Sequence, residues 1–552
     1  MQLNWQLNSM ADFSFTADQQ AAIDSNSNMV ITACPGSGKT TVIAEKIRNE
    51  VNELPAYQGI IGITFTVKAS KELKQRCKRN ACDTKASFFG TIDHFCLSEI
   101  IFPFFARVID RKKRSLECIQ KKDIPQNIKD ELISILEYEE DITSTLFNLF
   151  ATDIKVLFDH GYIVLELLGV IATHILSESH ACQRYFIAKY CSVYIDEYQD
   201  SSEPQHTLFL KLLELGLVGV AVGDVQQSIY AWRGSNPEFI NELTNTPEIF
   251  EHHMVNINHR CHPSITNYSN RLYKPDCDLL PTDQIRVYRR SFNGTQVDVA
   301  GEINKSIKLA MQNGCANSYS DIGILVRNNI SLEFLENSLD VPFRIFDEDP
   351  LAVRNTNVCN LFAHLLRFRF DDKHRLNDVI EFLERLSNIP LNKLALTRKK
   401  ILQVSGKDRE DLSTSIIQVT ETLLSLTIKE SDKTIIDKIC LESRLLKHYK
   451  PINEDEVQVM TLHKSKGLEF EVVYHLDLYD WIHPKRKFVQ GCYDVVYDNW
   501  EQELNLHFVG ITRAKNYCVL VTSNSRLNGN YDVKQGNPSQ FLSLPGLDGL
   551  YL

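Results

Sequence analysis

Residues 33–40 read Ala33-Cys34-Pro35-Gly36-Ser37-Gly38-Lys39-Thr40 and follow the apolar run Met29-Val30-Ile31. An apolar strand that leads into a loop of small residues and then a helix predicts a phosphate-binding loop. Backbone N–H groups of such a loop surround the phosphates, and the start of the helix adds the positive end of its dipole. Lys39 is expected to neutralise charge on the β- and γ-phosphates, and the Thr40 hydroxyl to hold Mg²⁺. The stretch therefore predicts binding of a nucleoside triphosphate rather than a structural glycine turn, although Ala33 stands where the common motif has glycine.

Composition limits the number of domains, the kinds of binding surface and the cellular location that the chain can have. The chain has 552 residues, 43% of them apolar, which is enough for about three or four domains. A net charge of −11 means that any nucleic acid must be bound through local basic grooves. The fourteen cysteines form no C-x-x-C pair or zinc-type quartet, the chain starts without a signal-peptide pattern, and no apolar run is long enough to span a membrane. We therefore expect a reduced, soluble protein of the cytoplasm.

The pattern of apolar runs predicts an α/β fold. Short runs rich in β-branched residues alternate with helical segments, as is typical of buried parallel strands. Two stretches, at about residues 97–188 and 371–452, are helical in pattern and interrupt this alternation. The expected fold has two α/β cores, each with a helical insertion. The expected strands are Val30–Ala33, Ile60–Phe65, Ser192–Ile195, Val218–Val222, Ile322–Val326, Val457–Leu462, Val472–Leu476 and Cys518–Thr522.

A pair of acids follows one of these strands directly, in the sequence Val193-Tyr194-Ile195-Asp196-Glu197-Tyr198-Gln199-Asp200. A carboxylate at a strand end beside a phosphate loop is suited to hold Mg²⁺, and its neighbour can polarise the attacking water. We predict Asp196 as the metal ligand and Glu197 as the general base.

These motifs, in this order, resemble the UvrD/PcrA/Rep family of superfamily 1 DNA helicases. Phe15-Thr16-Ala17-Asp18-Gln19 is similar to the family's adenine-reading motif, and Ala33 matches the family's AxxGSGKT loop. Asn258-His259-Arg260 is similar to the NYR motif, and Val509-Gly510-Ile511-Thr512-Arg513-Ala514 to VGVTRA. The resemblance implies two RecA-like cores that enclose Mg²⁺-ATP, with catalytic roles for Lys39, Glu197, Gln227, Arg260 and Arg513, the last as an arginine finger. The implied nucleotide-binding residues are Gln19, Thr32, Ala33, Cys34, Pro35, Gly36, Ser37, Gly38, Lys39, Thr40, Thr41, His259, Arg260, Glu469 and Arg513.

Further motifs resemble the family's DNA-contacting segments. Residues 64–69 (TFTVKA) are similar to TFTNKA, residues 222–234 to VGDDDQSIYxWRG, and residues 461–470 to TLHxxKGLEF. The implied DNA contacts are Phe65, Thr66, Lys68, Thr91, Tyr230, Trp232, Arg233, Thr461 and His463. Independently of any family, interleaved Tyr, Trp and Arg at 230–233 suit a platform for stacked bases, although core aromatics would give the same residue types.

Two residues depart from the family pattern. His259 replaces the tyrosine that stacks on adenine, which keeps a flat ring but weakens the stacking. Asp93 stands where many members have histidine, and an anion facing a DNA phosphate would repel it. The basic run 111–114 is consistent either with a solvated loop or with a phosphate-contacting patch.

The motif positions divide the chain into four parts. Residues 1–96 and 189–268 are expected to form the first RecA-like, ATP-binding core, and residues 97–188 a helical insertion in it. Residues 269–370 and 453–552 are expected to form the second core, with a small helical insertion at 371–452.

The compact layout and residues 475–482 (HLDLYDWI) resemble the helicase-like subunits of bacterial Gabija antiphage systems. This implies a role in antiviral defence with a separate nuclease partner of the overcoming-lysogenization-defect (GajA-like) type. Two functions stay open. The chain is either an ATP-driven translocase on single-stranded DNA, moving 3′→5′ by resemblance, or a DNA-stimulated ATPase that senses DNA ends or nucleotide and regulates a nuclease without processive unwinding.

Overall fold

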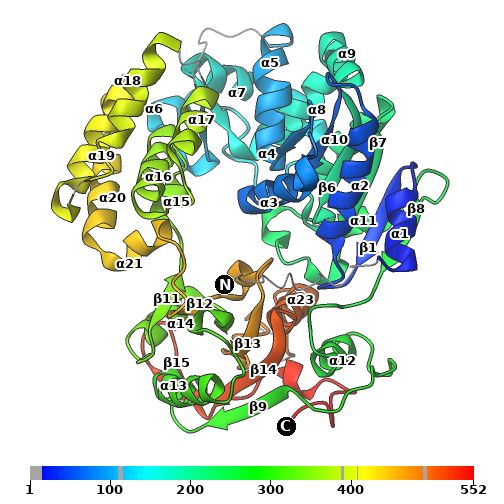
Figure 1. Ribbon diagram of the computed structural model, residues 1–552, viewed down its shortest axis with the longest axis vertical. Helices are drawn as coiled ribbons and strands as arrows, with labels where there is room; N and C mark the ends of the chain where they lie inside the picture. Colours follow the sequence, from blue (N-terminus) through cyan, green and yellow to red (C-terminus); the bar gives the residue numbers. More distant parts are fainter. Residues whose placement is uncertain (1–14, 110–115, 387–390, 407, 489–493) are drawn as a thin grey trace, which may run out of the picture. The chain divides into compact units, whose positions relative to one another are not determined.

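Two contact-defined units make up the chain in this computed structural model, which describes residues 15–109, 116–386, 391–406, 408–488 and 494–552 (Figure 1). Unit 1 comprises the described residues within Met1–Lys112, Pro125–His160 and Leu165–Arg260. Unit 2 comprises the described residues within Lys113–Ile124, Gly161–Val164 and Cys261–Leu552.

Unit 1 is built on a six-stranded sheet in the order β3-β2-β6-β7-β1-β8, in which every neighbouring pair is parallel. Its apolar core joins the sheet to α1 and α2 through residues such as Ile31, Val42, Ile47 and Val220. The strands are β1 (Met29–Ala33), β2 (Gly59–Ile63), β3 (Phe88–Gly90), β6 (Tyr190–Asp196), β7 (Val218–Gly223) and β8 (Glu251–Val255). The main helices are α1 (Ala17–Asp24), α2 (Lys39–Glu53), α3 (Val67–Cys77), α4 (Ile92–Phe95), α7 (Phe147–His160), α8 (Leu168–Glu178), α9 (His180–Lys189), α10 (Glu203–Glu214) and α11 (Glu238–Thr244).

Unit 2 contains a second all-parallel sheet of six strands, in the order β11-β12-β10-β13-β14-β9. Helices α13 and α14 pack on it through Ile303, Ile307 and Leu332. The strands are β9 (Val287–Phe292), β10 (Ile322–Val326), β11 (Phe343–Phe346), β12 (Val457–Thr461), β13 (Phe470–His475) and β14 (Ala514–Ser523). The main helices around the sheet are α12 (Pro263–Arg271), α13 (Gln296–Gln312), α14 (Asn329–Glu336), α22 (Leu462–Ser465) and α23 (Trp500–Ile511).

A separate helical core lies within unit 2. Buried residues such as Leu361, Phe362, Ile416 and Ile436 hold these helices together. The helices are α15 (Pro350–Arg354), α16 (Asn357–Phe370), α17 (Leu376–Leu386), α18 (Leu391–Leu402), α19 (Arg409–Leu424), α20 (Glu430–Leu441) and α21 (Ser443–Leu446).

The mixed α/β class with parallel sheets is confirmed, and each of the expected strands is present close to its predicted bounds. Strands β3, β8, β9 and β11 of the two large sheets were not expected. Strand β8 reads Glu-His-His-Met-Val and is mostly exposed at the sheet edge, so it carries no apolar run to reveal it. A small parallel pair, β4 (Glu117–Ile119) with β5 (Tyr162–Val164), also interrupts the helical stretch 97–188. Among the described helices, none has the length and apolarity needed to cross a membrane.

Candidate nucleotide and nucleic-acid site

The phosphate loop lies where β1 ends and α2 begins. Gly36 and Gly38 both have positive φ, +71° and +81°, and Gly38 is the residue that caps α2. Such angles favour glycine, because a side chain there is strained against its own backbone. The backbone therefore turns tightly into the helix, which points its N-terminal N–H groups into the loop.

The NYR-like segment packs directly against this loop. His259 N donates to Gly36 O at 3.0 Å, and a Cβ built on Gly36 would lie 2.4 Å from Arg260 Cβ. Asn258 Oδ1 accepts from Arg260 N at 2.9 Å and fixes the turn. The structure thus brings Arg260 and His259 beside the phosphate loop, and their contact with a nucleotide stays a prediction.

Gln19 reaches the same loop from α1. It is 1% exposed, its Nε2 donates to Ser37 O at 2.9 Å, and its Oε1 accepts from Thr16 N in a capping box. Ser37 is equally buried, and its Oγ has no hydrogen-bond partner within the part of the chain that is described. A buried, unsatisfied hydroxyl in a phosphate loop fits a ligand that supplies an acceptor, such as a nucleotide phosphate.

Two hydroxyls of the predicted nucleotide-binding set are engaged within the fold. Thr32 Oγ1 lies 2.7 Å from His252 Nε2, and Thr41 Oγ1 accepts from Arg76 Nη1 at 3.1 Å. These contacts order the flanks of the loop, and nucleotide contacts by Thr32 and Thr41 stay predictions.

The acid pair ends β6 on the same edge of the sheet. Asp196 is 8% exposed, and its Oδ1 accepts from Glu197 N at 3.0 Å. Glu197 has a φ of +59°, an unusual value for a residue with a side chain and one often found at functional sites. Because β1, β6 and β7 are parallel and adjacent in the sheet, their carboxyl ends place the loop and these acids together. The carboxylate of Asp196 and the hydroxyl of Thr40 are the hard oxygen donors that Mg²⁺ prefers.

Two buried residues that the sequence reasoning gave no role extend this group. Gln199 Nε2 donates to Glu197 Oε2 at 2.5 Å, and Gln199 Oε1 accepts from Asp224 N at 2.9 Å. Asp224 Oδ2 in turn accepts from Gln227 Nε2 at 2.6 Å. Burial raises the pKa of Asp224, and the charge of Lys39 partly opposes that rise. A signal for Asp224 existed, since it follows the apolar run 218–222 as Asp196 follows its own strand.

Aromatic side chains gather near the end of β2. Phe65 and Tyr230 stack with ring centroids 4.8 Å apart and an interplanar angle of 17°. Trp232 is 63% exposed, and the Arg233 guanidinium lies over its ring at 4.5 Å. An exposed tryptophan with a cation on its face is open to stacking with a base, so the alternative of a core aromatic does not describe Trp232.

The polar residues of the predicted DNA-contacting set are also placed in unit 1. Thr66 caps α3 by accepting from Ala69 N at 3.1 Å, and Thr91 caps α4 by accepting from His94 N at 3.3 Å. Lys68 and Asp93 are exposed on the first turns of these helices. Both threonines therefore have a structural role that is independent of DNA.

A small pocket is lined both by a residue of the aromatic group and by the acid pair. Its lining includes Thr64 and Phe65 from the end of β2, Asp196 and Glu197 from the end of β6, and Gln205 of α10. The residues expected to meet DNA and those expected to hydrolyse the nucleotide thus share one pocket wall in unit 1.

In unit 2, Thr461 ends β12, and His463 lies half-buried in α22. Glu469 is exposed and pairs with Lys515 at 2.9 Å. Arg513 is 1% exposed, and its guanidinium donates to Val509 O at 3.1 Å and to Leu468 O at 3.2 Å. To bind a phosphate, this guanidinium would have to give up hydrogen bonds to these carbonyls and donate to the phosphate instead. Its role as an arginine finger stays a prediction.

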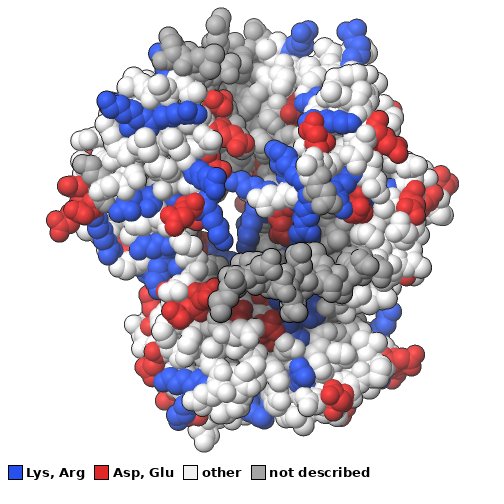
Figure 2. Space-filling model, viewed as in Figure 1, with Lys and Arg blue, Asp and Glu red and all other residues white. Residues whose placement is uncertain are grey.

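Basic and acidic side chains are interspersed on the face seen in Figure 2, in keeping with the net charge of −11. The basic run 111–114 lies outside the described residues.

Comparisons with known proteins match two families. Residues 19–233 match the family described as AAA domain, and residues 391–525 match the UvrD-like helicase C-terminal domain. Together these segments make up more than half of the chain.

Relatives align over nearly the whole chain. The Gabija protein GajB of Bacillus cereus is 27% identical over 533 residues, which cover 92% of this chain and 95% of the relative. The ATP-dependent DNA helicase Rep of Buchnera aphidicola subsp. Schizaphis graminum is 26% identical, with 96% of each chain covered. The ATP-dependent DNA helicase PcrA of Leuconostoc citreum is 23% identical, and the alignment covers 93% of this chain and 82% of the relative.

Proposed function

Because this chain belongs to the UvrD-like superfamily 1 helicases, we propose that it hydrolyses Mg²⁺-ATP and uses the energy to move along single-stranded DNA. The observation that carries the proposal is the shared edge of the first sheet. The phosphate loop, the acid pair and the aromatic group all lie where its parallel strands end.

Hydrolysis is assigned to residues of unit 1. Lys39 and the loop N–H groups neutralise and orient the phosphates, while Glu197 accepts a proton from the water that attacks the γ-phosphorus. Gln199 orients the carboxylate of Glu197, and Gln227 orients that of Asp224, each by donating a hydrogen bond to it. Mg²⁺, when held by Thr40 and Asp196, neutralises charge on the phosphate oxygens. Positioning of this kind supplies most of the catalysis in phosphoryl transfer.

DNA binding is assigned to the aromatic group. Trp232 and the Phe65–Tyr230 stack offer flat faces to bases, and such stacking tolerates any sequence. The pocket wall shared by Phe65 and Glu197 gives a short physical route by which DNA contact and hydrolysis can influence each other.

Direction, location and biological role are proposed from the relatives. Likeness to Rep and PcrA supports 3′→5′ movement, and likeness to the Gabija protein GajB supports a cytoplasmic antiviral role with a separate nuclease partner. The alternative function is a DNA-stimulated ATPase that senses DNA ends or nucleotide and regulates this nuclease. The small helical insertion expected from the sequence at 371–452 favours this alternative, because the resemblance implies that the larger accessory domain of long helicases in this family is tied to the regulation of unwinding.

A forked-duplex assay on the isolated chain separates the two functions. We expect ATP-dependent strand separation of duplexes with a 3′ single-stranded tail and none with a 5′ tail, and no activity in Lys39→Ala. Hydrolysis stimulated by DNA without strand separation would favour the sensor. Hydrolysis that DNA does not stimulate would contradict both.

A further inference from the structure

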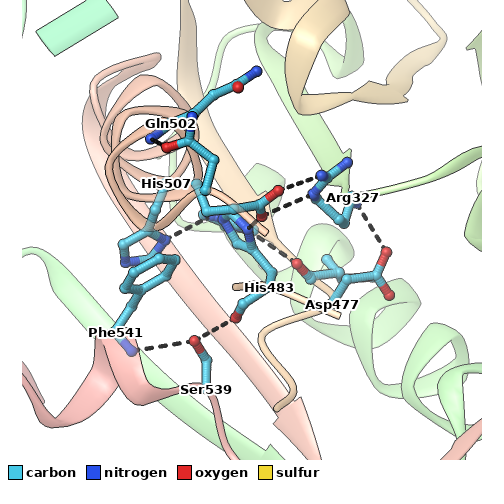
Figure 3. A network of polar contacts seen from close by, with 11 residues as sticks. Arg327, Asp477, His483, Gln502, His507, Ser539 and Phe541 are labelled. Carbon is cyan, nitrogen blue, oxygen red and sulfur yellow. Dashed lines mark hydrogen bonds and ion pairs between the residues drawn. The ribbon is translucent and has the colours of Figure 1, made fainter. Parts of the chain in front are cut away.

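Three fully buried histidines converge in unit 2, and none of them is among the residues assigned above to nucleotide or DNA. His475 ends β13, His483 lies in the loop that follows, and His507 lies in α23. Each is 0% exposed. One ring nitrogen from each lies within 4.8 Å of the other two, and no other such group of three is found among the described residues. Figure 3 shows His483 and His507 facing the same small space beside Phe541.

The hydrogen bonds of these rings define where their lone pairs lie. His475 Nδ1 is 3.1 Å from Leu476 O, a carbonyl that can only accept, so Nδ1 carries the proton and Nε2 carries a lone pair. His507 Nδ1 lies 3.0 Å from that Nε2 and therefore donates to it. His483 Nδ1 lies 2.7 Å from Glu503 Oε2 and donates to this carboxylate.

This arrangement leaves two buried lone pairs without a donor. The Nε2 atoms of His483 and His507 have no hydrogen-bond partner anywhere in the described ranges. Buried polar atoms are rarely left unsatisfied, and each such atom needs an explanation. A ligand that accepts lone pairs, rather than a donor from the protein, would satisfy both.

The surroundings of His483 also favour such a ligand. Its Nδ1 donates to the Glu503 carboxylate, which itself pairs with the guanidinium of Arg327. Neutral imidazoles, one of them oriented by a carboxylate, are the usual ligands of transition-metal ions.

We propose that His475, His483 and His507 bind one divalent transition-metal ion, with Zn²⁺ as the expected metal. His483 and His507 would bind through their unpartnered Nε2 atoms. His475 would bind through its Nε2, which requires that the His507 ring shift so that its Nδ1 no longer donates to this atom. Zn–N distances of about 2.0–2.1 Å place tetrahedral ligands about 3.3 Å apart, so a pair of nitrogens at the 4.8 Å limit would have to approach by roughly 1.5 Å. Glu503, held by Arg327 Nε at 3.1 Å, fixes the ring of His483 as a carboxylate commonly fixes a metal-binding histidine.

The ion would join three elements that are separate in sequence. It would tie the end of β13 and its following loop to α23, the helix that ends at Ile511, shortly before Arg513. His475 also packs on that helix, since a Cβ on Gly510 would lie 3.2 Å from His475 Nε2. The expected role is structural: the metal fixes the helix that carries the VGVTRA-like segment.

The test uses the full chain without a polyhistidine tag, stripped of metal by chelation and then titrated with Zn²⁺ or Co²⁺ alone. We expect about one equivalent of Zn²⁺ by elemental analysis, a rise of several degrees in Tm, and the intense visible bands of four-coordinate Co²⁺. His483→Gln and His507→Gln should each lose this binding by at least about 100-fold, since a ligand is removed.

The matched control is His374→Gln. His374 Nε2 lies 3.1 Å from His364 Nδ1 in the same unit, but no third ligand converges on this pair within the described residues. This control should keep the metal. Both ligand variants retain Asp196, so binding at the nucleotide site does not produce the expected difference. A wild-type chain that shows neither Co²⁺ bands nor a Tm shift would overturn the proposal, whether or not the variants fold.

Discussion

Gln199 donates a hydrogen bond of 2.5 Å to Glu197, and its other amide atom accepts from the backbone of Asp224. One fully buried side chain therefore connects the strand end that carries the predicted general base with the strand end that carries Asp224. Glu197 itself has a left-handed backbone conformation. Holding a strained residue in place is the expected task of such a contact.

Removing this contact should lower the rate of hydrolysis more than nucleotide binding. In Gln199→Ala we expect kcat for DNA-stimulated ATP hydrolysis to fall about 10- to 100-fold, because Glu197 loses the donor that orients it. KM for ATP should change by no more than a few fold. Gln183→Ala is the control, since Gln183 donates to two carbonyls in the helical part of unit 1. An unchanged kcat in a folded variant would show that Gln199 does not position the base.

Glu197→Gln tests the base directly. An amide cannot accept the proton of the attacking water, so hydrolysis should fall by about 10²–10⁴ while ATP still binds. Steady-state ATPase assays with equilibrium nucleotide binding measure both quantities. Glu214→Gln, at the exposed end of α10, should leave both unchanged. If Glu197→Gln keeps full DNA-stimulated hydrolysis, another group is the base.

Gly36→Ala should disrupt the phosphate loop. A Cβ at this position would lie 2.4 Å from Arg260 Cβ and 2.6 Å from Asn258 Oδ1, on a backbone with φ of +71°. We expect ATP affinity to fall at least about 10-fold, because the loop must move away from residues 258–260. Gly301→Ala is the matched control: it lies in α13, and its Cβ would meet no described atom within 4 Å. Equal ATP affinities in the two variants, measured by fluorescent-nucleotide titration, would contradict the packing argument.

Trp232→Ala should weaken DNA binding without affecting the nucleotide. Loss of one stacking face costs about 1–3 kcal/mol, which corresponds to roughly 5- to 150-fold in Kd for single-stranded DNA. Fluorescence anisotropy with a labelled oligonucleotide measures this change. Tyr57→Ala, at another aromatic that is 70% exposed, should bind DNA normally. Normal DNA affinity in Trp232→Ala would remove this side chain from the interface.

Asp347 should make part of the stability of unit 2 dependent on pH. Burial opposes its ionisation, but hydrogen bonds from His448 and Arg444 outweigh burial and lower the pKa of Asp347 to about 2. A lowered folded-state pKa stabilises the fold above the unfolded value near 4, and this contribution is lost as the pH falls from about 4 towards 2.

We therefore expect Asp347→Asn to lower the free energy of unfolding by about 1–2 kcal/mol near pH 7, allowing for the partial exposure of Arg444. The difference from wild type should shrink below about pH 4. Urea unfolding at several pH values measures this difference, with the exposed Asp548→Asn as control. A difference that stays constant with pH would exclude the ionised carboxylate as its source.

The sequence by itself determined the features whose residues are contiguous. The phosphate loop, the acid pair at 196–197 and the expected apolar strands each lie within one short segment, so residue type and spacing predict them. The edge strand β8 has no such segment, because only one of its residues is buried. Only the tertiary structure decided how separate segments meet.

The tertiary structure placed Gln199 between Glu197 and Asp224. It also brought residues 475, 483 and 507 together, although their spacing in the sequence matches no metal-binding motif. The physical reason is that the carboxyl ends of parallel strands lie at the same edge of a sheet. In addition, a helix that packs on the sheet can bring a histidine that is distant in the sequence close to a strand end. Neither relationship leaves a trace in local residue patterns.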